Sequence, residues 1–143
     1  MSFQARIAEA RRTGDYNRLV DGIPYLKWLG IRLEQREGEV ISVMPFAEML
    51  IGNPMLPALH GGVTGAFLES AAIISLMAAM DTPKLPKTIN ITIEYLRPGG
   101  PADTYATGTI TKQGRRVANV RALAWQDDRA HPIAAATAHF LLA

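Results

Sequence analysis

Apolar residues run almost without interruption from residue 61 to residue 80, and Glu69 is the one ionisable residue among them. At 1.5 Å per residue, a helix of this length measures about 30 Å, the width of a small domain. A helix that is apolar on every side is either enclosed by protein or placed in a membrane. Because a carboxylate lies near its middle and two glycines begin it, the pattern predicts a buried central helix and not a bilayer span.

Two amphipathic segments precede the central one. In residues 3–20 the apolar positions fall roughly on one helical face, and Gly14 interrupts the pattern, which predicts a surface helix that can break there. Residues 23–30 carry Pro24 near the start and Gly30 at the end, the arrangement typical of a short helix. We expect this short helix to cover the core as a lid.

A hairpin and a loop are expected between these helices and the central one. Residues 31–36 and 39–45 alternate apolar and polar side chains around a turn, a pattern typical of a β-hairpin. Residues 47–59 contain Gly52, Pro54 and Pro57 and show no periodicity. A loop of this length just before a long helix is more often functional than not.

The residues after the central helix predict a turn at 81–87 and then antiparallel strands. Residues 88–95 alternate strictly, with Ile89, Ile91, Ile93 and Tyr95 on one face. Three further strands are predicted at 103–112, 115–125 and 133–142. One side of them carries small residues: Ala118, Ala122, Ala124, Ala134, Ala136 and Ala138. Small side chains let a sheet curl closely around the long helix, so we expect an α+β fold with the sheet wrapped about that helix.

Composition limits the class of protein. The chain has 143 residues, 48% hydrophobic and 20% charged, which suits one domain with its own core and a helical extension at residues 1–28. Zero cysteines exclude disulfides, a thiol nucleophile and thiolate-ligated metals, and are compatible with the cytoplasm. No signal peptide is visible in residues 1–12. A net charge of +2 is compatible with an anionic ligand but does not indicate one.

Several kinds of site find no support in the pattern. The three histidines lack the spacing of metal ligands, so no metal is expected. Neither a phosphate-binding loop nor a dinucleotide-binding glycine pattern occurs. Basic residues are not interleaved with aromatic ones, which disfavours nucleic acid as a partner.

A resemblance rests on three features: the His60-Gly61-Gly62 turn, Glu69 nine residues after His60, and Tyr95-Leu96-Arg97-Pro98 at the end of a strand. Together they resemble the hotdog-fold acyl-CoA thioesterases, in particular the phenylacetyl-CoA thioesterase-type branch of the 4-hydroxybenzoyl-CoA thioesterase superfamily. The resemblance spans residues 29–142. It implies a hotdog fold and hydrolysis of an aryl- or medium-chain acyl-CoA to the acid and free coenzyme A. Coenzyme A is then part of the substrate, and no separate cofactor is expected.

The start of the central helix and Glu69 suit thioester hydrolysis. Unpaired N–H groups at a helix start carry partial positive charge, and Gly61 lets a substrate oxygen approach them. Such an oxyanion hole stabilises the transition state by about 3–4 kcal/mol per donor. Glu69 would act as the base or nucleophile. The alternatives are that the glycines only permit a tight turn and that Glu69 only lies on an exposed stripe of the helix.

Distance separates these two groups. Gly61 and Glu69 are eight residues apart, about 12 Å along one helix axis, which a glutamate side chain does not span. If both act on one thioester, they must come from two subunits with antiparallel helices, which gives two symmetric sites. The resemblance implies the same: relatives form dimers by joining their sheets, and dimers often pair into homotetramers.

The resemblance also implies roles for three more residues. Thr88 stands where relatives place the side chain that positions water, and Asn53 where an amide holds the thioester carbonyl. His60 would be an orienting hydrogen-bond donor. The alternatives are an ordinary outward-facing threonine and a structural histidine. Asn53 stands seven residues before His60, where the family pattern has six, and Pro54 takes the expected place, so the oxyanion side departs from the pattern.

Basic residues should mark the phosphates of coenzyme A. The candidates are Arg97, Lys112, Arg115 and Arg116, with a solvated hairpin tip as the alternative. Apolar residues of 47–59 are expected to line the acyl pocket. Two other functions stay open: a non-catalytic acyl-CoA- or lipid-binding protein of the same fold, and a hotdog hydratase or dehydratase.

Overall fold

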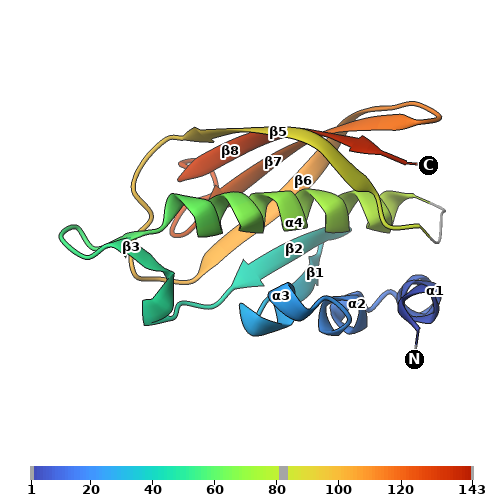
Figure 1. Ribbon diagram of the computed structural model, residues 1–143, viewed down its shortest axis with the longest axis horizontal. Coiled ribbons are helices and arrows are strands. Elements are labelled where there is room, and N and C mark those ends of the chain that lie inside the picture. Colours follow the sequence, from blue (N-terminus) through green and yellow to red (C-terminus); the bar gives the residue numbers. More distant parts are fainter. Residues whose placement is uncertain (1, 81–83, 143) are drawn as a thin grey trace.

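A long helix, α4 (Gly61–Ala79), lies against one face of a six-stranded antiparallel sheet (Figure 1). The computed structural model describes residues 2–80 and 84–142, so part of the turn predicted at 81–87 lies outside the described residues. In their order across the sheet, the strands are β1 (Arg32–Arg36), β2 (Glu39–Met44), β6 (Thr104–Gln113), β7 (Val117–Trp125), β8 (Ala134–Leu141) and β5 (Lys87–Tyr95). The predicted α+β hotdog architecture is confirmed.

The N-terminal segment forms three helices on the side of α4 away from β5: α1 (Phe3–Thr13), α2 (Asn17–Asp21) and α3 (Pro24–Trp28) (Figure 1). The prediction of one helix over residues 3–20 is therefore wrong in its extent, although the break falls where glycine suggested it. Gly14 adopts φ +77° and its amide donates to the Ala10 carbonyl, an ending that glycine favours because it has no Cβ. Leu19 and Leu26, one on each short helix, are buried in the core.

Residues 47–59 are more ordered than predicted. They contain a 3₁₀ turn, η1 (Glu48–Leu50), and a two-stranded ribbon of β3 (Ile51–Asn53) and β4 (Ala58–Leu59). The ribbon brings the backbone of Gly52 against His60, where a Cβ atom would lie 2.6 Å from the His60 Cα. Strands of two and three residues are too short to show a period, which is why the sequence indicated an irregular loop here.

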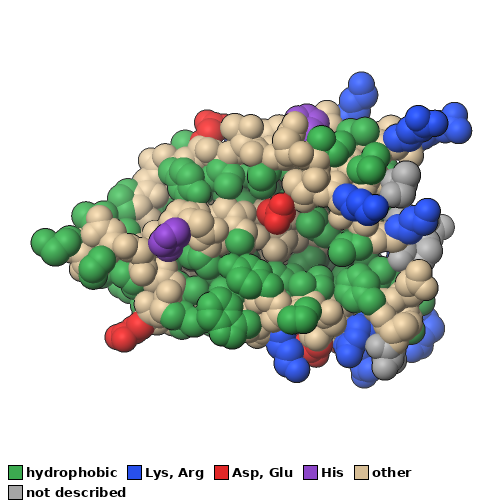
Figure 2. Space-filling model, viewed as in Figure 1, with side chains coloured by type: hydrophobic (Ala, Val, Ile, Leu, Met, Phe, Trp, Pro, Cys, Tyr) green, Lys and Arg blue, Asp and Glu red, His purple; other side chains and the backbone are tan. Residues whose placement is uncertain are grey.

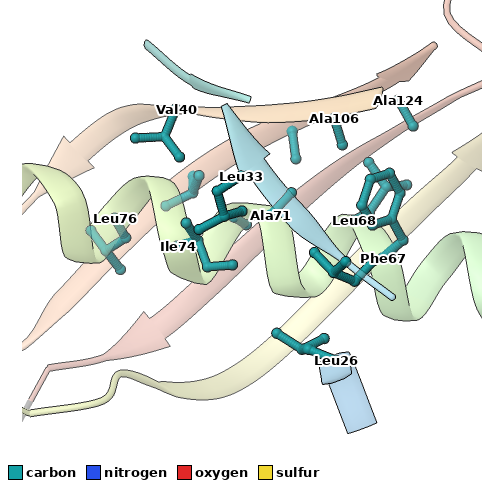
Figure 3. Packing of buried hydrophobic residues seen from close by; sticks show 14 of the residues in the cluster. Leu26, Leu33, Val40, Phe67, Leu68, Ala71, Ile74, Leu76, Ala106 and Ala124 are labelled. Carbon is teal, nitrogen blue, oxygen red and sulfur yellow. The ribbon is translucent and has the colours of Figure 1, made fainter. Parts of the chain in front are cut away.

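The core lies where α4 meets the alanine-lined face of the sheet. Phe67, Leu68 and Ala71 on α4 are fully buried against small residues of β6 and β7, among them Ala106 and Ala124 (Figure 3). All six alanines predicted to line the sheet are buried. Burying a side chain the size of Phe or Leu stabilises a fold by about 1.5–3 kcal/mol, so this contact fixes the position of α4 and of everything it carries.

Strand β5 forms one edge of the sheet and pairs only with β8 among the described strands. Ile91 and Ile93 pack against the core, whereas Ile89 and Tyr95, near the two ends of the strand, remain 53% and 58% exposed. The predicted alternation holds from Asn90 to Tyr95, whereas a shift in register between Thr88 and Asn90 interrupts it at Ile89.

By length and composition α4 also meets the criteria for a membrane span, with a mean hydropathy of 1.5. Half of that window is buried inside the domain. This burial is in agreement with the prediction of a central helix enclosed by protein.

Candidate active site

His60 caps the first turn of α4. Its Nδ1 accepts a hydrogen bond of 2.8 Å from the Gly62 amide, the position in which serine or aspartate usually serves as helix cap. An Nδ1 that accepts leaves the proton of the neutral ring on Nε2, which is then a donor only. The Nδ1 of His60 is therefore not free to act as a base, and the role of this residue as an orienting hydrogen-bond donor stays a prediction.

The amide of Gly61 lies beside this cap. Among the described residues it donates to no acceptor, while the Gly61 carbonyl accepts a hydrogen bond of 2.7 Å from the Tyr95 hydroxyl. A Cβ at Gly61 would lie 3.4 Å from the Tyr95 ring, and one at Gly65 would lie 2.7 Å from the Ile93 Cδ1. These two glycines, one turn apart, thus let β5 cross close to the start of α4. The contact of Tyr95 with this turn was not predicted from the sequence, because it joins residues 34 positions apart.

An open cavity of about 450 Å³ adjoins the helix start. Gly61 and Thr64 line one side, and Tyr95, Leu96 and Arg97 line the side formed by the end of β5. The cavity therefore brings Gly61, at the helix start, and Arg97 to the same concave surface, which suits an anionic or carbonyl-bearing ligand.

Glu69 lies two turns further along α4, half-buried. It lines a second cavity, of about 220 Å³, whose other walls are mostly apolar side chains of α2, α3 and α4. No ion pair or hydrogen bond joins the Glu69 side chain to another residue in the ranges 2–80 and 84–142. An unpaired carboxylate beside apolar side chains is a candidate catalytic group. In Figure 2 apolar side chains flank the exposed side of α4 along both of its edges.

Thr88 and Asn53 have no hydrogen bond to Glu69 in this chain. Thr88 is exposed near the start of β5, opposite Phe140. Asn53 is exposed on the ribbon, where its Oδ1 accepts a hydrogen bond of 3.0 Å from the Met55 amide and so stabilises a local turn. The roles assigned to these two residues by resemblance stay predictions.

The structure divides the predicted basic residues into two groups. Lys112, Arg115 and Arg116 surround the tip of the β6–β7 hairpin, beside an open cavity of about 490 Å³. Basic side chains gather at this end of the molecule in Figure 2. The tip lies near the Lys87 end of β5, since Lys87 and Val117 both pair with Leu141. Arg97 follows the opposite end of β5, about 27 Å away for eight residues of strand, so one chain does not bring the two groups together.

The other histidines have local partners. His131 Nδ1 lies 2.8 Å from the Asp128 carboxylate, and His139 Nδ1 lies 2.6 Å from the Asn90 side-chain oxygen. The part of the chain that the structure describes contains no group of three residues suited to hold a metal ion.

A long helix held by an antiparallel sheet, with a free glycine amide at its start and a carboxylate two turns along, defines a hotdog-fold protein with a candidate hydrolytic site. The family model of the thioesterase superfamily matches residues 56–133, which is more than half of the chain. The chain belongs to the thioesterase superfamily and is a thioester hydrolase. The predicted family is confirmed.

Particular relatives agree with this assignment. The medium/long-chain acyl-CoA thioesterase YigI of Salmonella typhimurium is 30% identical over 135 residues, covering 84% of this chain and 86% of that protein. A solved protein of Chromobacterium violaceum is 44% identical with a TM-score of 0.79, and the match covers 97% of both chains. A phenylacetic acid degradation-related protein of Ralstonia eutropha JMP134 has a TM-score of 0.75 at 23% identity, covering 87% of this chain and 97% of that one, and shares the fold.

Proposed function

We propose that the chain hydrolyses acyl-CoA thioesters to the free acid and coenzyme A, as a homodimer in which Glu69 of one subunit faces Gly61 of the partner subunit. The observation that carries the proposal is the pair of unused groups on α4: an unpaired Glu69 carboxylate in an apolar cavity and a Gly61 amide without a protein acceptor. The relative of 30% identity, whose name gives acyl-CoA as its substrate, supports the choice of thioester.

The chemistry follows from these two groups. Glu69 accepts a proton from water as the water oxygen attacks the thioester carbonyl carbon, and the Gly61 amide donates to the oxyanion that forms. The carbon–sulfur bond then breaks, and the proton held by Glu69 passes to the departing sulfur, which leaves coenzyme A as the thiol. Direct attack by the carboxylate, followed by hydrolysis of the acyl anhydride, is the nucleophilic version of the same step. Both versions require the carboxylate.

The free edge of β5 supports a dimer. An exposed strand of nine residues, with Ile89 and Tyr95 uncovered, is a ready template for pairing with another strand. If Gly61 of each α4 meets Glu69 of the other, the two-fold axis passes nearest residue 65, midway between them. Pairing of two such dimers would give the homotetramer that the resemblance implies.

The same two-fold symmetry would bring the two groups of basic residues, from different subunits, close together. Antiparallel pairing of β5 with its copy sets the Arg97 end of one strand towards the Lys87 end of the other. The hairpin tip with Lys112, Arg115 and Arg116 lies near that second end. We propose that the phosphates of coenzyme A bind between Arg97 of one subunit and the hairpin tip of the other. No separate cofactor takes part, and the cytoplasm is the proposed location.

A thiol-release assay across a panel of acyl-CoA thioesters tests the proposal. Turnover by Glu69→Gln should fall at least a hundredfold with the fold intact, while the matched change Glu48→Gln, of an exposed glutamate on η1, should leave the rate within twofold. A near-normal rate for Glu69→Gln would remove Glu69 from the mechanism.

Two further outcomes identify the other functions. Tight binding of acyl-CoA without release of thiol would indicate the non-catalytic binding protein of the same fold. A change in the ultraviolet absorbance of enoyl-CoA without thiol release would indicate a hydratase.

A further inference from the structure

The N-terminal extension forms one wall of the cavity beside Glu69. Its walls come from three places in the sequence: α2 and α3 with Ile23 between them, the second half of α4 about fifty residues later, and Leu85 after α4. The lining residues are Leu19, Ile23, Tyr25, Leu26, Glu69, Ser70, Ile73, Ile74, Met77 and Leu85. Glu69 is the one charged group among them, and none of the apolar residues of 47–59 takes part.

The lining suits a hydrocarbon chain. The Ser70 hydroxyl is satisfied by the Ala66 carbonyl at 2.8 Å, so its polar group is already paired. Apart from Glu69, a ligand in this cavity therefore meets mostly carbon atoms. Each methylene removed from water there would raise binding about fourfold.

The dimensions favour a straight chain of medium length. Glu69 and Met77 bound the cavity along α4, eight residues or about 12 Å apart. A zigzag of carbon–carbon bonds of about 1.5 Å covers this span with about eight to ten carbons. The volume of about 220 Å³ leads to a similar number, since an engineered protein cavity of about 150 Å³ holds benzene, with six carbons.

We propose that this cavity is the acyl pocket and that it selects unbranched acyl groups of about eight to ten carbons over shorter and aryl ones. The side chain of Ile73 sets the length of acyl chain that the cavity can hold. The inference rests on the proposed function, because Glu69, which lines the cavity, is the group that would act on the thioester. Ile73 lies one turn after Glu69 and lines the cavity while only half-buried, so its size can change without emptying the core.

The experiment compares kcat/KM for butanoyl-, octanoyl-, hexadecanoyl- and phenylacetyl-CoA. The unaltered protein should prefer octanoyl-CoA to the other three. Ile73→Phe fills the cavity and should lower the ratio of octanoyl to butanoyl kcat/KM at least tenfold. Ile73→Ala enlarges it and should shift the preference towards hexadecanoyl-CoA. The matched control is Ile110→Phe, at a half-buried isoleucine on β6 away from this cavity, and it should leave the ratio within twofold.

Equal effects of Ile73→Phe on all four substrates, or a preference for phenylacetyl-CoA, would overturn the proposal. If the unaltered protein releases no thiol from any thioester, the proposed hydrolysis fails, and calorimetric dissociation constants of the same four compounds then test the pocket alone. A chain-length preference in those constants that Ile73→Phe abolishes supports the pocket, and constants independent of chain length and of residue 73 overturn it.

Discussion

The Tyr95 hydroxyl ties the end of β5 to the first turn of α4 through the carbonyl of Gly61, at 2.7 Å. Tyr95 and Gly61 also line the same cavity at the start of α4. One side chain therefore fixes both the strand end that carries Arg97 and the orientation of the predicted oxyanion donor.

Removal of this hydroxyl tests its structural role. We expect Tyr95→Phe to lower the free energy of unfolding by about 1 kcal/mol, the usual net worth of one hydrogen bond. Urea unfolding monitored by circular dichroism measures it, with Tyr25→Phe as control, since the Tyr25 hydroxyl has no hydrogen bond to another described residue. Equal stability of Tyr95→Phe and the unaltered protein would show that water replaces the bond without cost.

A second residue-scale contact joins the start of β2 to the loop before β8. The Arg129 guanidinium donates hydrogen bonds of 2.8 and 2.7 Å to the two Glu39 oxygens and lies 4.9 Å from the Trp125 ring centre. Its hydrogen bonds lower the pKa of Glu39 below the ordinary value of 4.5. Because the folded-state pKa is the lower one, the pair stabilises the fold above the ordinary pKa, and this stabilisation is lost as the pH falls through the lowered value.

Glu39→Gln should accordingly destabilise the protein by about 0.5–1 kcal/mol at pH 7, a small effect because both side chains are nearly half exposed to solvent. The difference in the free energy of unfolding between Glu39→Gln and the unaltered protein should begin to decrease only below about pH 4.5, as Glu39 becomes protonated. Urea unfolding across the range from pH 7 to pH 3 measures it, with Glu37→Gln as control. A difference that is the same at pH 3 and pH 7 would contradict the ion pair as its cause.

At the scale of elements, Gly108 sets how closely α4 approaches the sheet. A Cβ there would lie 3.0 Å from the Val120 Cγ1, 3.2 Å from the Ala72 Cα and 3.2 Å from the Ser75 Cβ. The Gly108 amide also donates to the Ser75 hydroxyl at 3.0 Å. Ala72 and Ser75 belong to α4, so an added Cβ at Gly108 can be accommodated only if the helix shifts.

Gly108→Ala should lower the free energy of unfolding by about 1–3 kcal/mol, the usual cost of overpacking a tight core. Gly114→Ala is the control, because its Cβ would meet only the Val117 carbonyl oxygen, at 3.4 Å, in an exposed turn. Thermal unfolding of the two variants side by side gives the comparison. A neutral Gly108→Ala would mean that α4 can move away from the sheet without loss.

The sequence predicted the elements whose pattern is long enough to read. The apolar run of α4, the alternation in β5 and the alanines of β7 and β8 each repeat a period over several turns or residue pairs, and the resemblance supplied the site on α4. The ribbon of β3 and β4 was missed because it is too short to have a period. The cavity beside Glu69 was missed for another reason: Leu19 and Glu69 become neighbours only through tertiary packing, which no local pattern encodes.

On the scale of the whole molecule, the proposed site is complete only in an assembly of two chains. Ile89→Asp, on the exposed end of β5, should therefore yield a monomer by light scattering after gel filtration and reduce thioesterase turnover at least a hundredfold, because a charge opposes strand pairing. Thr137→Asp, at an exposed position of the interior strand β8, is the control. A monomer with full activity would show that one chain suffices.

The six alanines beneath α4 also limit how this enzyme can be made more heat-resistant. All are fully enclosed, with helix on one side and neighbouring strands beside them, so a larger residue at any of them has no space to occupy. Gains in melting temperature must come from elsewhere, for example from shorter or stiffer connections at the surface or from charges placed along the exposed strands. Stabilising substitutions should therefore leave the six alanines unchanged and be sought at the surface.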